Sequence, residues 1–257
     1  MIIRELNPDE KEKFNQIVSH PLQSWQWGEF KEKNGAQVVR IGQFAGSQLK
    51  NGLQLMIHSL PKTDWKIGYL PKCNLFDQQL LQTLKALAQK QKLIFIKIEP
   101  NSTTGKDFFL QNQCLYGRPL FTKYTFQLDL NQKEDELLQK MKQKTRYNVK
   151  LAQKKGVKVS RDNSLAAFNQ YLKLTFDTTK RQKFYAQDQN YHQLMWKIMA
   201  PAGLAHLLKA EYQGKILVTW VMFVFNQVLY YPYGASSREH KEVQASTLMM
   251  WEAIRFG

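Results

Sequence analysis

The sequence predicts a mixed α/β fold arranged as two domains of similar size. Its 257 residues are 43% hydrophobic, which is enough to bury one large core or two ordinary ones. Short apolar strands alternate with amphipathic helices along the chain. A strand, a helix and a run of strands occur in both halves, and we place the boundary near Asp129, between domains at residues 1–128 and 129–257.

The first half alternates helices and strands. Asn7 is suited to cap a first helix, and a tryptophan-rich helix follows over residues 24–33. The short apolar run LIFIKIEP is typical of a buried strand, and it ends at Glu99 and Pro100. The other elements expected here are strands over residues 38–44, 53–59 and 66–70 and a helix over residues 77–90.

The second half begins with an alternating segment and a long helix. Residues 124–130 alternate apolar and polar side chains, which predicts a strand. Asn131 then caps one helix, which Glu134 supports through a capping box and Gly156 ends in a left-handed turn. Further on we expect a short strand over residues 157–160, two helical stretches, a meander of strands over 205–212, 216–225 and 228–236, and a helix from about Gln244.

The long helix carries an unusual charge. Between Lys140 and Arg161 there are nine Lys or Arg residues and no acid, in a chain whose net charge is +16. A merely solvated helix face normally mixes both signs, so this segment favours a polyanionic partner over that alternative. Four of its cations recur at spacing four and form one stripe on the helix: Lys142, Arg146, Lys150 and Lys154.

Composition and spacing argue against several classes of protein. The longest mostly apolar run, residues 216–225, is too short to cross a bilayer, and the N-terminus lacks the apolar region of a signal peptide, so we expect a cytoplasmic protein. Cys73 and Cys114 lie far apart without metal-ligand spacing, so we expect reduced thiols and no metal site. No nucleophile or zinc motif is present.

Four local patterns together resemble one known family. They are QSWQWGEFKEKNG from residue 23, IGYLPKC from residue 67, KTRYNVKLAQKKGV from residue 144 and YYPYGASSREH from residue 230. The family is FemABX, which transfers amino acids from aminoacyl-tRNA onto peptidoglycan precursors, and the resemblance covers essentially the whole chain. It implies two domains similar to the GNAT acetyltransferase fold. The second is expected to be incomplete, because family members continue past the helix that ends this chain.

The resemblance also implies a reaction. An amine on the stem peptide of lipid II or UDP-MurNAc-pentapeptide attacks the ester that joins an amino acid to tRNA. Because that ester is already activated, alignment of amine and ester supplies much of the acceleration. No cofactor is implied besides aminoacyl-tRNA as co-substrate, and the cationic stripe becomes its binding surface. A membrane-borne acceptor also suggests peripheral contact with anionic lipids at the inner face of the cell membrane.

Family matches select candidate substrate residues. Lys31 matches a lysine that contacts the precursor diphosphate, with an ordinary exposed helix lysine as the alternative. Tyr191 and Tyr233 match tyrosines that contact the precursor or line the cleft, although Tyr233 is equally explained by cross-strand packing. Trp25 and Trp27 are expected to be buried anchors instead.

One matched position departs from the family. Gln187 stands where the family has a phosphate-binding arginine, and a neutral amide cannot neutralise phosphate. Our hypothesis is that Arg181 or Lys183 compensates from nearby. Glu99 is the candidate acid that holds the incoming amine or accepts its proton, and the alternative is a strand-end carboxylate paired with a lysine.

Two other functions compete with this one. An acyl-CoA-dependent N-acyltransferase of the GNAT fold would use an Arg/Gln-x-x-Gly-x-Gly/Ala loop for the CoA pyrophosphate, and the sequence contains no such loop. A non-catalytic tRNA- or RNA-binding module would need only the basic helix and aromatic side chains.

Overall fold

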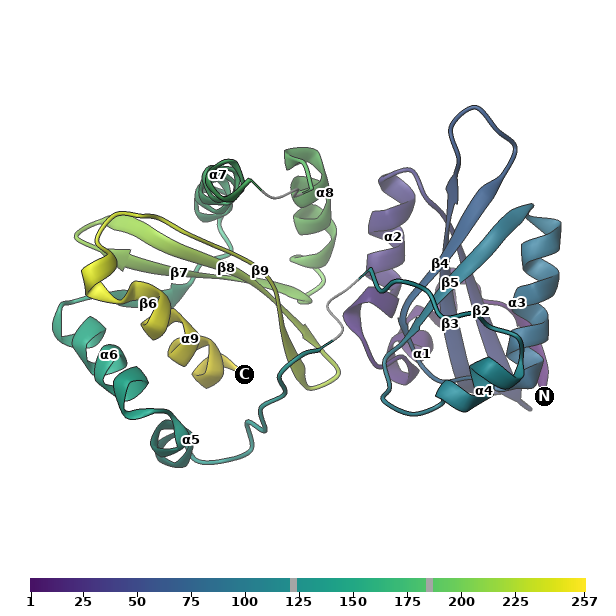
Figure 1. Cartoon of the computed structure of the whole chain (residues 1–257), viewed down its shortest axis with the longest axis horizontal. Helices are drawn as coiled ribbons and strands as arrows, with labels where there is room; N and C mark the ends of the chain where they lie inside the picture. The colour runs from purple at the N-terminus through teal and green to yellow at the C-terminus, as the bar shows by residue number, and fades with distance from the viewer. Residues whose placement is uncertain (121–123, 184–186) are drawn as a thin grey trace. The chain divides into compact units, whose positions relative to one another are not determined.

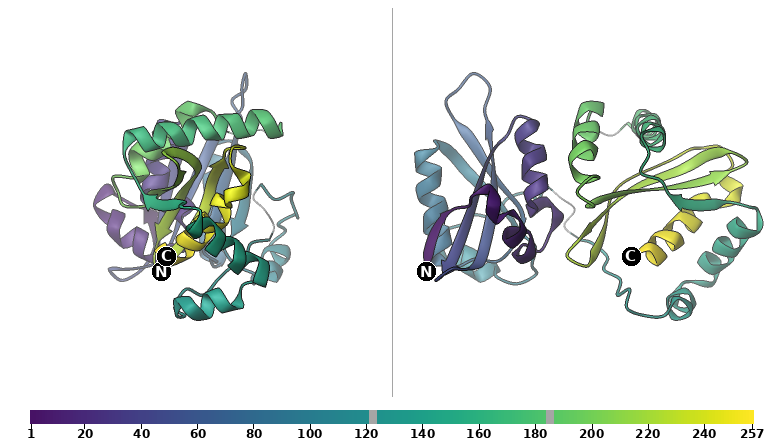
Figure 2. Two further views of the ribbon diagram at one scale, coloured as in Figure 1. Left: turned by 90° about the vertical axis from the view of Figure 1, so that its left-hand side faces the viewer. Right: turned by 180° about the vertical axis from the view of Figure 1, so that it is seen from behind.

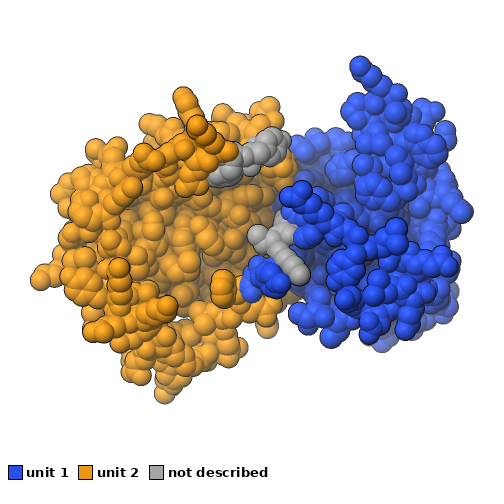
Figure 3. Space-filling view, in the orientation of Figure 1, with its two compact units in different colours: residues 1–125 blue, residues 126–257 orange. Residues whose placement is uncertain are grey.

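The computed structural model describes the chain over residues 1–120, 124–183 and 187–257. It divides into two compact units, unit 1 from Met1–Thr125 and unit 2 from Phe126–Gly257 (Figure 3). The predicted boundary at residue 128 lies three residues beyond this division. Each unit has its own sheet with helices on both faces, so the predicted mixed α/β class is confirmed (Figure 1).

Unit 1 is built on a five-stranded sheet in the order β1-β2-β3-β4-β5. All neighbouring strands are antiparallel except β4 and β5, which are parallel. Helices α1 and α2 cover one face and α3 covers the other (Figures 1 and 2). The elements are β1 (Ile2–Glu5), η1 (Pro8–Glu10), α1 (Lys11–Ile17), η2 (Pro21–Gln23), α2 (Trp25–Lys33), β2 (Gln37–Ala45), β3 (Gln48–Ser59), β4 (Lys66–Cys73), α3 (Gln78–Lys90), β5 (Leu93–Pro100) and α4 (Lys106–Gln111).

Helix α3 covers the sheet because its apolar residues recur at helical spacing. Asp77 caps the helix by accepting a hydrogen bond from the Leu80 amide at 3.0 Å. Leu80 and Leu84 are at most 1% exposed and pack onto strand residues such as Leu55 and Leu70. Full burial of one such leucine stabilises the unit by about 1.5 to 3 kcal/mol.

Helix α2 is held against the sheet by the residues of the QSWQWG pattern. Ser24 caps it by accepting from the Trp27 amide at 3.1 Å. Trp25 and Trp27 are 5% and 3% exposed, so the prediction of buried anchors is confirmed. Gly28 is required at the contact, because a Cβ there would overlap the side chain of Gln54 on β3.

Unit 2 is built on a four-stranded antiparallel sheet in the order β6-β7-β8-β9. Helix α7 packs on one face of this sheet, and α9, with α6 beside it, packs on the other (Figures 1 and 2). The elements are α5 (Glu134–Lys140), α6 (Gln143–Lys154), β6 (Lys158–Arg161), α7 (Leu165–Gln182), α8 (Gln189–Met199), β7 (Ala205–Tyr212), β8 (Lys215–Phe225), β9 (Val228–Ser236), η3 (Lys241–Val243) and α9 (Ala245–Phe256).

The predicted meander in unit 2 is confirmed, and its turns lie where the sequence placed them. Gln213 and Gly214 both have positive φ between β7 and β8, as do Asn226 and Gln227 between β8 and β9. Two positive φ values in succession are the geometry that matches the twist of an antiparallel hairpin. The helix expected from Gln244 is also present as α9. None of the helices in the described parts of the chain is long and apolar enough to span a membrane.

The predicted strand over residues 124–130 is wrong. These residues belong to neither sheet, and Tyr124, Phe126 and Leu128 are more than half exposed. Alternation of apolar side chains forms a strand only where a neighbouring strand supplies backbone partners. This segment instead joins the two units.

The single helix predicted between Asn131 and Gly156 is also wrong. Two helices, α5 and α6, are separated at Met141 and Lys142, which have extended backbone. Asn131 does not cap α5, because the N-cap residue is Lys133. The backbone and side-chain N–H groups of Asn131 donate to Asp129 instead. The stop at Gly156 is confirmed, with φ of 86°.

Candidate functional site

Lys31 extends from α2 over two aromatic rings. Its Nζ lies 5.3 Å from the ring centroid of Trp27 and 5.1 Å from that of Phe30, both of which are buried. Such contacts stabilise a cation at the ring face. Burial lowers the pKa of Lys31 to about 8. The amine is therefore largely charged at neutral pH and is partly desolvated, which suits it to bind an anion.

Glu99 lies near the carboxyl end of β5, beside the parallel strand β4. Its Oε2 accepts a hydrogen bond from the Tyr69 hydroxyl at 2.7 Å, and its Oε1 accepts from the Leu120 amide at 2.6 Å. Burial and the bond to Glu99 raise the pKa of Tyr69. Each carboxylate oxygen keeps a second lone pair, so Glu99 can still accept from an amine.

The position of Glu99 is favourable for a binding site. In open α/β sheets, ligands bind outside the carboxyl ends of parallel strands. In unit 1 the parallel pair is β4 and β5, and Pro71 of β4 is the register partner of Glu99. The alternative was that Glu99 is a strand-end carboxylate paired with a lysine. Among the described residues, Glu99 makes no such ion pair.

Tyr191 and Tyr233 lie together in unit 2. Tyr191 is in the first turn of α8 and Tyr233 is in β9, and their hydroxyls are hydrogen-bonded. His192 meets both rings edge-on, with centroid distances of 5.7 and 5.2 Å. Its Nδ1 lies 3.1 Å from the hydroxyl of Tyr171, which is fully buried. Two matched tyrosines are thus held by one buried histidine and one buried tyrosine.

Gln187 lies directly before the N-cap residue of α8. Asp188 caps α8 by accepting from the Tyr191 amide at 2.8 Å, so Gln187 is exposed directly before the helix. Residues 184–186 of the same family-like segment lie outside the described part of the chain. Arg181 donates to the Ser236 carbonyl at 3.2 Å and so holds α7 to the end of β9. Lys183 is exposed at the C-cap of α7.

The four cations of the predicted stripe do not have one role. Arg146 is half-buried, and its guanidinium donates to the carbonyls of Gln139 and Met141 at the end of α5. It therefore satisfies the last carbonyls of one helix from within the next. Lys142 is the N-cap of α6 and not part of a continuous helix. Three cations of the stripe are exposed and make no ion pair among the described residues: Lys142, Lys150 and Lys154.

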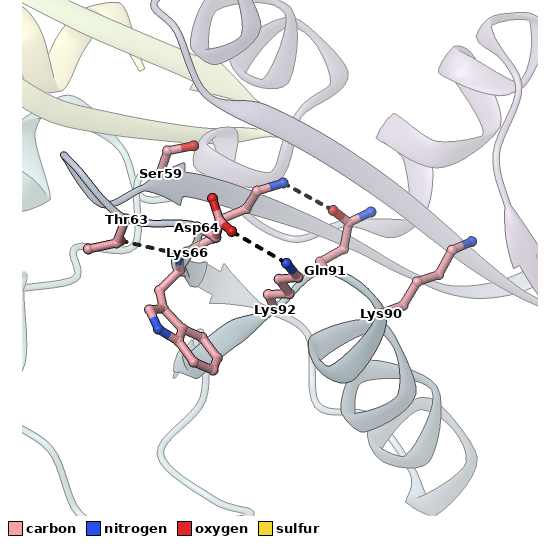
Figure 4. Close-up of a pocket in the computed structure, with 8 residues that line it drawn as sticks. Ser59, Thr63, Asp64, Lys66, Lys90, Gln91 and Lys92 are labelled. Carbon is pink, nitrogen blue, oxygen red and sulfur yellow. Dashed lines mark hydrogen bonds and ion pairs between the residues drawn. The ribbon is translucent and has the colours of Figure 1, made fainter.

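Other chemistry-bearing groups lie apart from these residues. A surface pocket at the other end of β4, lined by Trp65, Lys66 and Lys92 among others, contains none of the predicted site residues (Figure 4). Burial raises the pKa of Cys73 to about 12, so this thiol is unreactive. Within the described residues, no cluster of His, Cys, Asp or Glu is placed to hold a metal ion.

The loops that enter α3 and α9 bear on the choice of acyl donor. A glycine-rich turn at the N-terminus of a helix is a common binding site for a pyrophosphate. Here the segments 74–77 and 237–244 contain no glycine.

Sequence reasoning did not single out Tyr69 or His192. Tyr69 lies inside the IGYLPKC pattern and is 30 positions from Glu99 in the chain, so only the register of β4 and β5 brings them together. His192 directly follows the matched Tyr191 in the sequence, and this neighbouring position could have identified it as a candidate.

Comparison with known proteins covers both units. Residues 139–257 match the family model described as an acetyltransferase (GNAT) domain. The lipid II:glycine glycyltransferases of Staphylococcus haemolyticus and Staphylococcus epidermidis are 25% and 26% identical over 228 residues, covering 77% of this chain and 53% of theirs. The chain thus spans about half the length of these curated relatives. A crystal structure of FemX superposes with a TM-score of 0.85 at 18% identity, covering 100% of this chain and 85% of that one.

Two units with the same order of elements, the second matching the GNAT model, define a protein of the acyltransferase fold. Similarity to the glycyltransferases extends beyond that domain, because 77% of the chain is more than either unit holds. The chain is thus similar to the lipid II:glycine glycyltransferases and has the fold of FemX, in agreement with the resemblance to the FemABX family that its four sequence patterns predicted.

Proposed function

We propose that the chain is an aminoacyltransferase that moves an amino acid from aminoacyl-tRNA to an amine on the stem peptide of a peptidoglycan precursor. The observation that carries this proposal is the similarity to lipid II:glycine glycyltransferases across both units, together with the FemX fold over the whole chain. A single GNAT domain alone would support only a general acyl transfer.

The proposed reaction needs alignment and one proton acceptor. The amine nitrogen forms a bond to the ester carbonyl carbon, the bond from that carbon to the tRNA ribose oxygen breaks, and the proton lost by the amine returns to that oxygen. Glu99, which accepts a hydrogen bond from Tyr69 on one oxygen, would hold the amine and carry the proton. In unit 1, Lys31 would bind a precursor phosphate. In unit 2, Tyr191 and Tyr233 are the proposed precursor contacts.

Three exposed lysines would hold the tRNA. Lys142, Lys150 and Lys154 lie on or next to α6 and carry charge that the described residues do not neutralise by ion pairing. Arg146 is left out of this role because its guanidinium already binds the end of α5. The lipid-linked form of the acceptor would bring the protein to the inner face of the cell membrane, at a peripheral position.

The test measures transfer of label from charged tRNA. The purified chain is incubated with tRNA carrying radioactive amino acids and with either lipid II or UDP-MurNAc-pentapeptide, and the label in the precursor is counted. Transfer that depends on the precursor supports the proposal. Absence of transfer to both precursors, with equal binding of charged and uncharged tRNA, would indicate a non-catalytic RNA-binding module instead. Retention on immobilised CoA would favour the acyl-CoA alternative.

A further inference from the structure

Trp65 is exposed at the turn between β3 and β4, which projects beyond the sheet of unit 1 (Figures 1 and 2). The other five tryptophans of the chain are at most 8% exposed, whereas Trp65 is 54% exposed. The turn is ordered by its own hydrogen bonds. The Leu60 amide donates to the Trp65 carbonyl at 3.0 Å, and the Trp65 amide donates to the Thr63 hydroxyl at 3.2 Å. A fixed turn thus presents one large aromatic side chain to solvent.

Two more exposed apolar side chains lie at this end of the sheet. Leu93 is the register partner of Lys66, and the two residues after it, Ile94 and Phe95, lie at an irregularity in the pairing of β4 with β5. In a regular strand, successive side chains point to opposite faces of the sheet. Here both stay exposed, at 55% and 49%, which agrees with a bulge that re-aims a side chain. We call Trp65, Ile94 and Phe95 the apolar corner.

Lysines surround the apolar corner. The Lys66 amide donates to the Lys92 carbonyl at 3.1 Å, which joins the end of the turn to the residues before β5. Both side chains line a surface pocket together with Trp65 and Lys90 (Figure 4). Within residues 60–66 and 90–95 the only acid is Asp64, so this segment pair has a net charge of +3. Its four lysines, the lysine rim, are Lys62, Lys66, Lys90 and Lys92.

This composition fits a bilayer surface better than a protein or an RNA partner. Tryptophan is enriched where a membrane meets water, and lysine stems lie along apolar surface while their ammonium groups reach the lipid headgroups. Protein interfaces are depleted of lysine and enriched in arginine, but residues 60–66 and 90–95 contain four lysines and no arginine. Single-stranded RNA is bound by aromatic stacking, to which an exposed Ile94 contributes nothing.

The candidate phosphate-binding lysine lies toward the same end of the sheet. Burial and the charge of Lys31 lower the pKa of His58, so these two side chains are near each other. His58 is followed by Ser59, which pairs in register with Lys66 and lines the pocket beside Trp65. Glu99 lies near the other end of the β4–β5 pair. The diphosphate is the part of a lipid-linked precursor nearest the bilayer, and its candidate ligand is thus on the side of the apolar corner.

We propose that the apolar corner and its lysine rim dock unit 1 onto a bilayer that contains anionic lipids. The choice of a membrane rests on the proposed function, which supplies a lipid-linked acceptor. Trp65, Ile94 and Phe95 enter the headgroup region, and the lysines bind lipid phosphates around them. The diphosphate of a precursor in the same bilayer then reaches Lys31 from the membrane side.

The first test removes the exposed tryptophan. The probes are vesicles of phosphatidylglycerol and phosphatidylcholine in equal amounts, and vesicles of phosphatidylcholine alone, and binding is measured by sedimentation. Trp65→Ser is compared with Tyr116→Ser, because Tyr116 is an exposed aromatic residue of unit 1 that lies beside Lys106 of α4. Quenching of tryptophan fluorescence by lipids with brominated acyl chains is measured on the same proteins.

The second test removes charge from the rim. Lys66 is kept, because its ammonium group donates to the side chains of Gln37 and Gln91. The rim variant replaces three exposed lysines with glutamine: Lys62, Lys90 and Lys92. Its control makes the same change at three exposed lysines on other parts of unit 1: Lys13, Lys50 and Lys106.

The wild type and both controls should bind the mixed vesicles, and phosphatidylcholine alone should bind about 10-fold or more weakly. Trp65→Ser should lose about 10-fold in affinity for the mixed vesicles, and the rim variant about 100-fold, since each lysine near the surface contributes about 5-fold. Brominated lipids should quench the wild type and not Trp65→Ser, because the other tryptophans are buried. All replaced side chains are exposed, so the variants should melt with the wild type.

The inference is overturned if the wild type does not sediment with the mixed vesicles. It is also overturned if Trp65→Ser and the rim variant bind as tightly as the wild type, which would assign membrane binding to another basic surface. A rim variant that loses affinity for tRNA and keeps its affinity for vesicles would assign the patch to RNA instead.

Transfer of label separates this inference from the proposed function. If the wild type transfers label to lipid II but does not bind the vesicles, the proposed function stands and the docking surface fails. If it binds the vesicles through Trp65 but transfers label to neither precursor, the docking surface stands and the proposed function fails.

Discussion

The two units share an order of elements but present different chemistry at the same strand. Each has a strand, two helices, a three-stranded meander and a helix, and each meander ends in a Tyr-x-Pro-x sequence. In unit 1 the sheet continues into parallel β5, and charged groups gather at the strand ends, namely Lys72 and Glu99. In unit 2 the corresponding strand carries Tyr233 in an aromatic cluster around His192. One fold thus supplies a charged strand end in one unit and an aromatic strand surface in the other.

This difference indicates which measured property a variant in each unit should change. Groups that handle protons and charge are expected in unit 1, because a carboxylate and a lysine lie at the open end of a parallel strand pair. Unit 2 is expected to contribute packing, aromatic contacts and the exposed lysines of α6. Variants in the two units should therefore change different measured quantities.

The largest effect is expected for Glu99, the proposed proton acceptor in unit 1. Glu99→Gln keeps the shape of the side chain and an acceptor for Tyr69 but cannot carry a proton. Transfer of label should fall by about 100-fold or more, the size expected for loss of a general base. Glu12→Gln, an exposed acid on α1, is the control and should keep wild-type activity. If the Glu99→Gln protein transfers label at the wild-type rate, Glu99 is not the general base of the reaction.

The next largest effect concerns the proposed binding of tRNA by unit 2. The triple variant Lys142→Ala, Lys150→Ala, Lys154→Ala should bind tRNA about 10-fold or more weakly, and the slope of log K against log salt should fall by roughly 2, since three phosphate contacts are lost. The control replaces three exposed lysines of unit 1, Lys13, Lys50 and Lys85, with alanine. Equal loss in both triple variants would show that net charge, and not α6, sets the affinity.

A smaller effect is expected from pH in unit 1. Because burial lowers the pKa of Lys31 to about 8, its charge is present at pH 7 and lost as pH rises through 8. Affinity for UDP-MurNAc-pentapeptide should fall roughly 10-fold between pH 7 and pH 9. The neighbouring His58 has a lowered pKa and stays neutral over this range.

Lys31→Arg is the matched control for this titration. An arginine stays charged above pH 9, so its affinity should change little across the same interval. Binding that weakens equally in the wild type and in Lys31→Arg would assign the pH dependence to another group.

The smallest effect is on the stability of unit 2. Arg146→Ala should lower the free energy of unfolding by about 1 to 2 kcal/mol, because the carbonyls of Gln139 and Met141 lose a charged donor. Lys150→Ala, on the exposed face of the same helix, should leave it unchanged within about 0.5 kcal/mol. Urea unfolding followed by circular dichroism compares the two. A smaller loss for Arg146→Ala than for Lys150→Ala would contradict its structural role.

Much of the fold was predictable because its signals are local. Helix caps and hairpin turns depend only on residues a few positions away. Examples are the caps at Ser24 and Asp77 and the turns around Gly214 and Gln227. The candidate residues were accessible through family resemblance, residue by residue. Their local partners, such as Tyr69 for Glu99, were not, since strand register joins residues distant in the chain.

The sequence by itself determined the α/β class, the meanders, the helix stop at Gly156 and the resemblance to the FemABX family. Only the tertiary structure decided that residues 124–130 belong to neither sheet and that the basic segment divides into two helices at Met141. It also decided that Lys72 adopts a left-handed backbone in a bulge. The physical reason is that periodicity and capping depend on neighbours in sequence. Pairing, breaks and strain depend instead on hydrogen bonds and packing between residues that only the folded chain brings together.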